Sequence, residues 1–296
     1  MGTAMRTAFV FAVLCSLPFG TAMASDIFVN NQTGDDRLAG TLPESVGLLG
    51  PCRTIAKALR IAGPRDRIIV ANTGMPYRES ITLQGPRHSG SDDFPFVIVG
   101  NGATLDGTVP LGEATWEYVG REIFRTRPPY LSFQQLFLGN QPAARKQPAA
   151  GKFPDLAARE WCLADGWLYF CTDPGRLPQA YELLCCGAQT GITLYEVHDV
   201  VVQDLVVRGY WLDGVNCHDN VRRSDLVRIE AKENGRSGIS IGGASRVRID
   251  TCTAAGNGAA QVRLEGFCRV QMLDNQLDAA SAPALVKEGG TIVEDK

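Results

Sequence analysis

The residues most able to do chemistry lie between positions 204 and 236. Tyr210 and Trp211 are adjacent aromatic residues, and such side chains can offer a flat apolar surface to a sugar ring. Asp213 stands before Gly214, where a turn enters a predicted strand. We therefore predict Tyr210 and Trp211 as substrate-binding residues and Asp213 as a catalytic carboxylate. An Asp-Gly pair is also common in ordinary turns, so that alternative stays open.

A second pair of candidates follows at the end of the same predicted strand. His218 and Asp219 place an imidazole beside a carboxylate, and histidine can carry protons near neutral pH. His218 is therefore a candidate catalytic residue, although a lone surface histidine is more often inert. Hydrolysis of a glycosidic bond uses two carboxyl groups, and Asp204 is the candidate partner of Asp213.

Charged residues elsewhere suggest ligand binding without fixing it. A lyase acting on a uronate needs a base and a cation that neutralises the substrate carboxylate. Arg236 is the candidate cation, with Arg222 and Arg223 as further candidates; all three could instead lie in solvated turns. The acidic pairs Asp35-Asp36 and Asp92-Asp93 could ligate Ca²⁺, but the spacing of a calcium loop is missing. We predict no metal site, and the cofactor requirement stays unknown.

Short strands that recur at a near-constant interval must position these side chains. Intervals of 24, 23 and 23 residues separate repeated strands that begin at Val215, Ile239, Val262 and Leu285. A period in this range indicates stacked rungs, each of which buries an apolar face on the next. Asn234 and Asn257 also lie one period apart, as turn asparagines stacked on successive rungs would.

Alternation along the repeated strands predicts two exposed charged columns. Arg228 and Arg248 would form one column, and Glu230 and Asp250 would form the other. These columns could line a charged groove for sugar. We favour the other interpretation, a salt-bridged solvent face.

An amphipathic helix is predicted before the first strands of the repeat. Between positions 50 and 63, apolar residues recur at helical spacing, with Thr54 as the N-cap and Gly63 as the end. A solenoid has open ends, and a helix that covers one end protects its unpaired strand edges.

The middle of the chain has a different pattern. Residues 110–190 contain Trp116, Trp161 and Trp167, and a hairpin is predicted over 161–170 around Asp165-Gly166. We interpret this region as a β-rich insertion on the side of the solenoid.

The N-terminus has the pattern of a secretory signal peptide. Arg6 precedes an apolar run at 8–14, and Ala22-Met23-Ala24 forms a small-residue cleavage site. The apolar run is too short to span a bilayer. We predict cleavage near Ala24 and a secreted or periplasmic protein with no membrane span.

Cysteine content and charge narrow the class further. Export permits disulfides, and Cys162 with Cys171 is the best pair because these residues flank the predicted hairpin turn. We expect Cys217, Cys252 and Cys268 to be small core residues. The formal net charge is −3, so the basic excess needed for a nucleic-acid surface is absent.

Several segments resemble a known superfamily. Residues 50–55, 68–70, 77–81 and 104–107 are similar to the N-terminal region of secreted right-handed β-helix proteins of the pectate-lyase-like superfamily. Residues 136–145 resemble the β-insertion of its hydrolase-like branch. The resemblance implies an all-β fold, a right-handed parallel β-helix with a short N-terminal capping helix and a hairpin-rich insertion.

The implied organisation and function follow from this fold. We expect a signal peptide at 1–24, a cap and first rungs at 25–109, the insertion at 110–190 and further rungs at 191–296. The expected function is that of a secreted carbohydrate-active protein with a polysaccharide as its partner. Two alternatives stay open, a glycoside hydrolase or lyase and a non-catalytic glycan-binding or cell-surface module. The oligomeric state is unknown.

Overall fold

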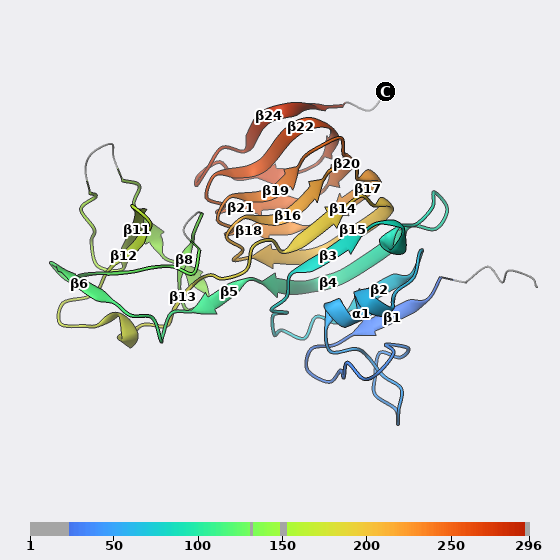
Figure 1. Cartoon of the computed structure of the whole chain (residues 1–296), viewed down its shortest axis with the longest axis horizontal. Helices are drawn as coiled ribbons and strands as arrows, with labels where there is room; N and C mark the ends of the chain where they lie inside the picture. Colours follow the sequence, from blue (N-terminus) through green and yellow to red (C-terminus); the bar gives the residue numbers. More distant parts are fainter. Residues whose placement is uncertain (1–23, 131–132, 149–152, 294–296) are drawn as a thin grey trace, which may run out of the picture.

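The computed structural model describes residues 24–130, 133–148 and 153–293. Figure 1 shows a solenoid of stacked strands with a smaller group of strands beside it, drawn in green and yellow-green. The predicted signal peptide lies outside the described residues except for Ala24. Within the described ranges, no helix is long and apolar enough to cross a membrane.

The solenoid has three sheet faces, which we number from their strand pairings. Face 1 contains β3 (Ile81–Gln84), β14 (Ile192–Tyr195), β16 (Asp213–His218), β19 (Ser237–Ile241) and the first parts of β22 (Ala260–Leu273) and β24 (Leu285–Ile292). Face 2 contains β1 (Asp26–Val29), β2 (Arg67–Val70), the first parts of β4 (Phe96–Asp106) and β15 (His198–Arg208), then β17 (Arg222–Val227), β20 (Arg246–Asp250) and the second part of β22. Face 3 contains the second parts of β4 and β15, then β18 (Glu230–Lys232), β21 (Thr253–Ala255) and β23 (Gln276–Leu277).

All strand pairings of these faces are parallel. The long strands β4, β15 and β22 bend at the corners, so the faces form one 15-stranded sheet. Val215 pairs with Ile239, Ile239 with Val262, and Val262 with Leu285. The residues that recur at the predicted interval are thus paired on successive strands. This confirms the predicted rungs and the predicted parallel β-helix.

The interior of the solenoid is filled by aliphatic columns. One column on face 1 has no exposed surface and consists of Ile192, Val215, Ile239 and Val262. Every second side chain of a strand points inward, so these residues stack directly on one another, and each contributes about 1.5–3 kcal/mol by its burial. Cys217, Cys252 and Cys268 belong to the same core, as predicted.

The helix α1 (Ile55–Ile61) covers the N-terminal end of this core. The Thr54 hydroxyl accepts a hydrogen bond from the Lys57 amide, which confirms the predicted N-cap. The Glu79 carboxylate accepts hydrogen bonds from the Ile55 and Ala56 amides, at 3.0 and 2.9 Å. The buried face of α1 packs near β1, β2 and β3. A short 3₁₀ helix, η1 (Pro86–His88), follows β3.

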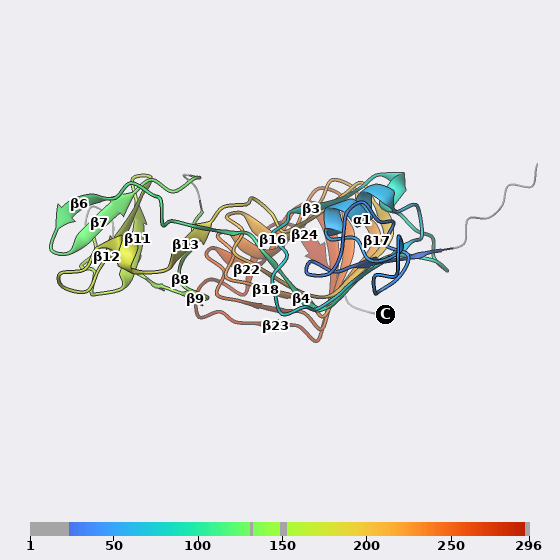
Figure 2. The same cartoon turned by 90° about the horizontal axis from the view of Figure 1, so that it is seen from below.

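The middle of the chain forms two small sheets. One has the order β10-β11-β12-β7-β6 and the other the order β5-β13-β8-β9. Their bounds are β5 (Thr108–Pro110), β6 (Glu117–Gly120), β7 (Ile123–Thr126), β8 (Leu136–Leu138), β9 (Gln141–Pro142), β10 (Ala144–Arg145), β11 (Glu160–Ala164), β12 (Trp167–Cys171) and β13 (Leu183–Cys186), with the 3₁₀ helix η2 (Pro178–Ala180). Trp161 lies opposite Phe170, which confirms the predicted hairpin. Figure 2 shows these sheets beside the solenoid.

The prediction of a disulfide between Cys162 and Cys171 is wrong. All eight cysteines among the described residues are buried and unbonded. Cys162 lies opposite Tyr169, and Cys171 lies opposite Ile123, so the hairpin does not place the two thiols as a cross-strand pair. Both side chains instead pack in a small apolar cluster with Leu156.

Candidate functional site

The structure joins two of the predicted site residues in a buried ion pair. Asp213 begins β16, and its carboxylate accepts hydrogen bonds from Nε and Nη2 of Arg236 at 3.0 and 2.6 Å. Asn216 Nδ2 donates to the same carboxylate at 2.8 Å. The Asp213 side chain is 0% exposed, so it orients Arg236 and Asn216 and does not reach solvent itself.

A shallow polar groove on face 1 lies next to this pair. Its volume is about 280 Å³, and it is lined by Ser80, Thr82, Gln189, Thr190, Thr193, Leu212, Asn216 and His218. Hydroxyl and amide groups of this kind can exchange hydrogen bonds with sugar hydroxyls. The His218 ring lies against Tyr195, and its Nδ1 is 3.1 Å from the Asp219 carboxylate. His218 is predictable from its residue type, whereas the neutral residues around it have no distinguishing pattern in the sequence.

Asp204 lies elsewhere and does not form the expected pair with Asp213. It is in β15 at the corner between face 2 and face 3, and its carboxylate is bound by Nε and Nη2 of Arg228 at 2.6 and 2.8 Å. The hydrogen bonds from Arg228 lower the pKa of Asp204, although burial opposes them. Asp213 and Asp204 bind different arginines, so the prediction that they form a carboxylate pair is wrong.

The prediction that Tyr210 and Trp211 together offer a flat surface to a sugar is also wrong. Tyr210 is fully buried, and its hydroxyl donates to the Glu79 carbonyl oxygen, so its ring cannot face a sugar. Burial raises the pKa of this hydroxyl. The Trp211 ring is half-buried and stacks on Tyr130 with the ring centroids 5.2 Å apart. Within the described residues, the Trp211 indole N–H has no hydrogen-bond partner.

The Asp213–Arg236 geometry recurs along the solenoid. In each case an aspartate accepts two hydrogen bonds from Nε and Nη2 of an arginine on the next rung, an arrangement we name the rung fork. The four forks join Asp199 to Arg223, Asp204 to Arg228, Asp213 to Arg236 and Asp225 to Arg248. Arg228 and Arg248 are thus salt-bridged, as the favoured interpretation predicted, but the two predicted columns are wrong: Arg248 is paired in register with Asp225, and Glu230 with Thr253. Their main partners come from the preceding rung.

The other charged candidates have partners in the protein. Asp35 binds Arg37, and Asp36 accepts hydrogen bonds from the Thr54 amide and hydroxyl before α1. Asp92 lies 3.1 Å from Arg223. Among the residues that the structure describes, no group of three or more His, Cys, Asp or Glu side chains could hold a metal ion.

A pocket on face 3, which we name the junction pocket, has no signal in the sequence. It lies between face 3, the loop after β2 and the β8–β9 hairpin, and its volume is about 370 Å³. It is lined by Asn72, Gly74, Met75, Pro76, Thr104, Asp106, Asn140, Gln141, Arg208, Lys232 and Glu233. Asp106, Arg208 and Lys232 occupy one register position on three adjacent strands. Solenoid and insertion therefore meet at a strongly polar site.

Arg208 lies at the centre of the junction pocket. Its Nη2 is 3.1 Å from the Glu233 carboxylate and donates to the Asn140 carbonyl at 3.2 Å. Its guanidinium lies over the Phe137 ring, 4.9 Å from the centroid. The Arg208 side chain is only 12% exposed. These contacts fix its orientation between the solenoid and the insertion.

The two carboxyl groups of the junction pocket have different surroundings. Burial raises the pKa of Glu233, and the nearby charge of Arg208 opposes this effect. Glu233 Oε2 has no hydrogen-bond partner with good geometry among the described residues. Asp106 accepts a hydrogen bond from the Thr108 amide at 2.8 Å, and Arg78 Nη1 is 4.0 Å away. Two carboxyl groups in unlike environments are what acid–base pairs in glycoside hydrolysis require.

Comparisons with known proteins concern the fold. No family model matches the sequence, and no curated protein matches it. A solved structure described as a glycoside hydrolase has a TM-score of 0.55 at 13% identity, over 85% of this chain and 74% of that chain. A complex of XylC with xylose (TM-score 0.41, 12% identity, 91% and 68% covered) and pectate lyase Pel9A (0.33, 11%, 94% and 80%) are also similar.

The parallel rungs and this likeness define the class of protein. The chain has a parallel β-helix fold, as the resemblance of its N-terminal segments predicted.

Proposed function

We propose that the protein is a polysaccharide hydrolase and that the junction pocket is its active site. The observation that carries the proposal is the pair of carboxyl groups, Glu233 and Asp106, in one polar pocket with Arg208 beside them. Burial raises the pKa of Glu233, which is the direction that a general acid needs. The amide side chains of Asn72, Asn140 and Gln141 would bind sugar hydroxyls.

Each carboxyl group has a distinct task in this proposal. Protonated Glu233 donates its proton to the glycosidic oxygen as the bond from that oxygen to the anomeric carbon breaks. Asp106 takes a proton from a water molecule, whose oxygen forms the new bond to the anomeric carbon. Asp106 and Glu233 come from β4 and the end of β18, with β15 between them. Adjacent strands lie about 4.8 Å apart, so the two backbones are roughly 10 Å apart. The proposed reaction is of the inverting type, in which the two carboxyl groups flank the attacking water molecule.

The remaining predictions fit this function. We propose that residues 1–24 direct export, that the mature protein acts outside the cytoplasm, and that residues 110–190 are an insertion that completes the pocket. The face 1 groove with His218, Asn216 and Arg236 is a further binding surface for the sugar chain.

The decisive experiment is a screen of the purified protein against a panel of polysaccharides. We expect new reducing ends without ultraviolet absorbance from unsaturated products. Glu233→Gln and Asp106→Asn should each lower kcat by about 10²–10⁴-fold, the usual contribution of a general acid or base. Glu117→Gln is the matched control, because Glu117 lies in β6, pairs with Arg125 and does not line the pocket.

Other products would overturn the proposal. Unsaturated ends would indicate a lyase, in which Arg208 or Lys232 neutralises a uronate carboxylate. Binding without any product would indicate the non-catalytic glycan-binding module. The Arg208–Glu233 ion pair would then be a structural contact between solenoid and insertion.

A further inference from the structure

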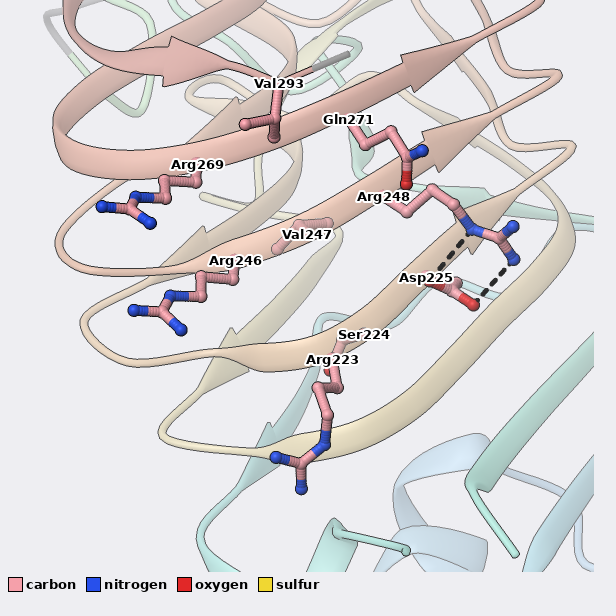
Figure 3. A pocket seen from close by; sticks show the side chains of 9 residues that line it. All are labelled: Arg223, Ser224, Asp225, Arg246, Val247, Arg248, Arg269, Gln271 and Val293. Carbon is pink, nitrogen blue, oxygen red and sulfur yellow. Dashed lines mark hydrogen bonds and ion pairs between the residues drawn. The ribbon is translucent and has the colours of Figure 1, made fainter. Parts of the chain in front are cut away.

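Face 2 has a column of arginines at its edge. Arg223, Arg246 and Arg269 follow one another at intervals of 23 residues, and Arg246 is paired in register with Arg269. Ser224 is paired with Val247, so Arg223 occupies the same position one rung earlier. Figure 3 shows the three side chains on successive rungs; those of Arg246 and Arg269 point in a similar direction, and that of Arg223 points downward in this view. We name them the arginine column.

The first arginine of the column is neutralised, and the next two are not. Arg223 forms a rung fork with Asp199 and lies 3.1 Å from Asp92. Arg246 and Arg269 are exposed, and within the described residues their side chains have no hydrogen-bond or ion-pair partner. In each rung fork, an aspartate lies one rung before the arginine. One rung before Arg246 and Arg269, the paired residue is instead another arginine.

This departure from the rung fork has an energetic cost. Like charges directly opposite each other on neighbouring strands repel, and Arg246 and Arg269 are such a pair. An anion between the two guanidinium groups would remove the repulsion. Arginine suits this task because its planar fork binds carboxylate or sulfate oxygens in pairs.

A groove runs beside the arginine column. Its volume is about 420 Å³, and its other wall includes Asp225, Arg248 and Gln271, which again lie on successive rungs. Arg248 is held by Asp225 at 2.9 and 3.2 Å, as the dashed lines in Figure 3 mark. The uncompensated positive charge of the groove therefore comes from Arg246 and Arg269.

We propose that this groove binds an extended anionic polysaccharide, with an acidic group of the chain on each of Arg246 and Arg269. Adjacent strands place the two backbones about 4.8 Å apart, so acidic groups on consecutive sugars can reach both guanidinium groups. The acidic groups are carboxylates or sulfate esters, which share this chemistry. The groove lies on face 2 and the junction pocket on face 3, so this site goes beyond the proposed hydrolysis and does not depend on it.

The test is a binding titration with four probes at low and at raised salt. The probes are polygalacturonate for carboxylates, dextran sulfate for sulfate esters, unmodified dextran and a single-stranded oligonucleotide. We expect one or both acidic polysaccharides to bind, more weakly at raised salt because ions screen exposed charges. Tighter binding of one of them identifies the acidic group.

Variants of the arginine column locate the site. Arg246→Gln and Arg269→Gln should each weaken binding about tenfold, the loss of one charge-assisted contact. Their combination should weaken it about a hundredfold. Both side chains are exposed and unpaired within the described residues, so the melting temperature should stay unchanged or rise. Arg228→Gln is the matched control, because it removes an exposed arginine from another corner.

Three results would overturn the proposal: unmodified dextran binding as tightly as the acidic chains, the double variant binding like the wild type, or the oligonucleotide binding most tightly. Glu233→Gln separates this proposal from the previous one. That variant should lose hydrolysis and keep anion binding.

Discussion

Burial and the charge of Arg208 act in opposite directions on the pKa of Glu233. Burial disfavours its charged form and raises its pKa, whereas the positive charge of Arg208 favours that form. Burial is the larger effect. A general acid must keep its proton at the working pH, so the balance between these contacts sets the upper pH limit of the proposed reaction.

Replacing Arg208 tests this balance. Arg208→Gln removes the contact that lowers the pKa of Glu233, so that pKa should rise further. Activity falls as the pH rises through the pKa of the acid, and the alkaline limb of the kcat profile should therefore move to higher pH. An unmoved limb, or one that moves to lower pH, would contradict the role of Glu233. Arg228→Gln, at a residue that does not line the pocket, should leave the profile unchanged.

At the scale of the elements, buried asparagines join successive rungs at one corner. Asn234 donates from its amide and its Nδ2 to Asn257 Oδ1, at 2.9 and 3.1 Å, and accepts from the Tyr210 amide at 3.1 Å. Asn257 Nδ2 donates to the Ala231 carbonyl at 2.9 Å. Both asparagines are 0% exposed. The predicted stacking is confirmed, and its reason is that the turns leave buried backbone groups that need partners.

Loss of one member of this ladder should be costly. Asn257→Ala leaves the Asn234 amide and the buried Gln261 Oε1 without these partners, and we expect a loss of about 3 kcal/mol in the free energy of unfolding. Denaturant unfolding followed by fluorescence measures it. Asn275→Ala is the control: Asn275 also binds the next corner, at Cys252 and Ile249, but is half-exposed, so water replaces its contacts and the loss should be smaller. Equal losses would refute this account.

The elements that the sequence predicts well are those with local signals. Thr54 before an apolar helical pattern, Asp165-Gly166 between two strands and the interval from Val215 to Ile239 all need only neighbouring residues or a fixed period. Each was found at its predicted position. The rung forks also follow from the period, since an aspartate is followed by an arginine 23 or 24 residues later.

The junction pocket lacks such a signal. Asp106 is paired with Arg208 across the insertion, so no repeat interval connects them. Asn140 comes from the insertion, whose position beside the solenoid has no pattern in the sequence. The prediction for Tyr210 and Trp211 is wrong for a related reason. Adjacent residues point to different sides of the chain, and only packing decides that Tyr210 faces inward.

At the scale of the whole molecule, the faces differ in chemical character. Face 1 has a groove of neutral hydroxyl and amide groups, face 2 has the arginine column, and face 3 has the carboxyl pair of the junction pocket. A solenoid allows this separation because the core needs only the inward residues, which leaves each outward column free to vary.

The rung forks also govern stability towards acid. Hydrogen bonds from Arg223 lower the pKa of Asp199, and those from Arg228 lower that of Asp204. The stability they contribute is present above the unfolded aspartate pKa of 3.8 and is lost as the pH falls through their lowered values. The melting temperature should therefore fall steeply below about pH 4. Asp199→Asn with Asp204→Asn should be less stable near neutral pH and flatten this fall, whereas an equally steep fall would exclude the forks as its cause.

All four rung forks have the same polarity, with the aspartate on the earlier rung and the arginine on the later one. When a ribosome makes the chain from its N-terminus, each aspartate emerges about two dozen residues before its arginine. A folded rung therefore already presents the aspartate carboxylate, and the arginine of the next rung can bind it as soon as that arginine has been made. The order of synthesis and the order of assembly coincide, so the solenoid can grow behind α1 one rung at a time.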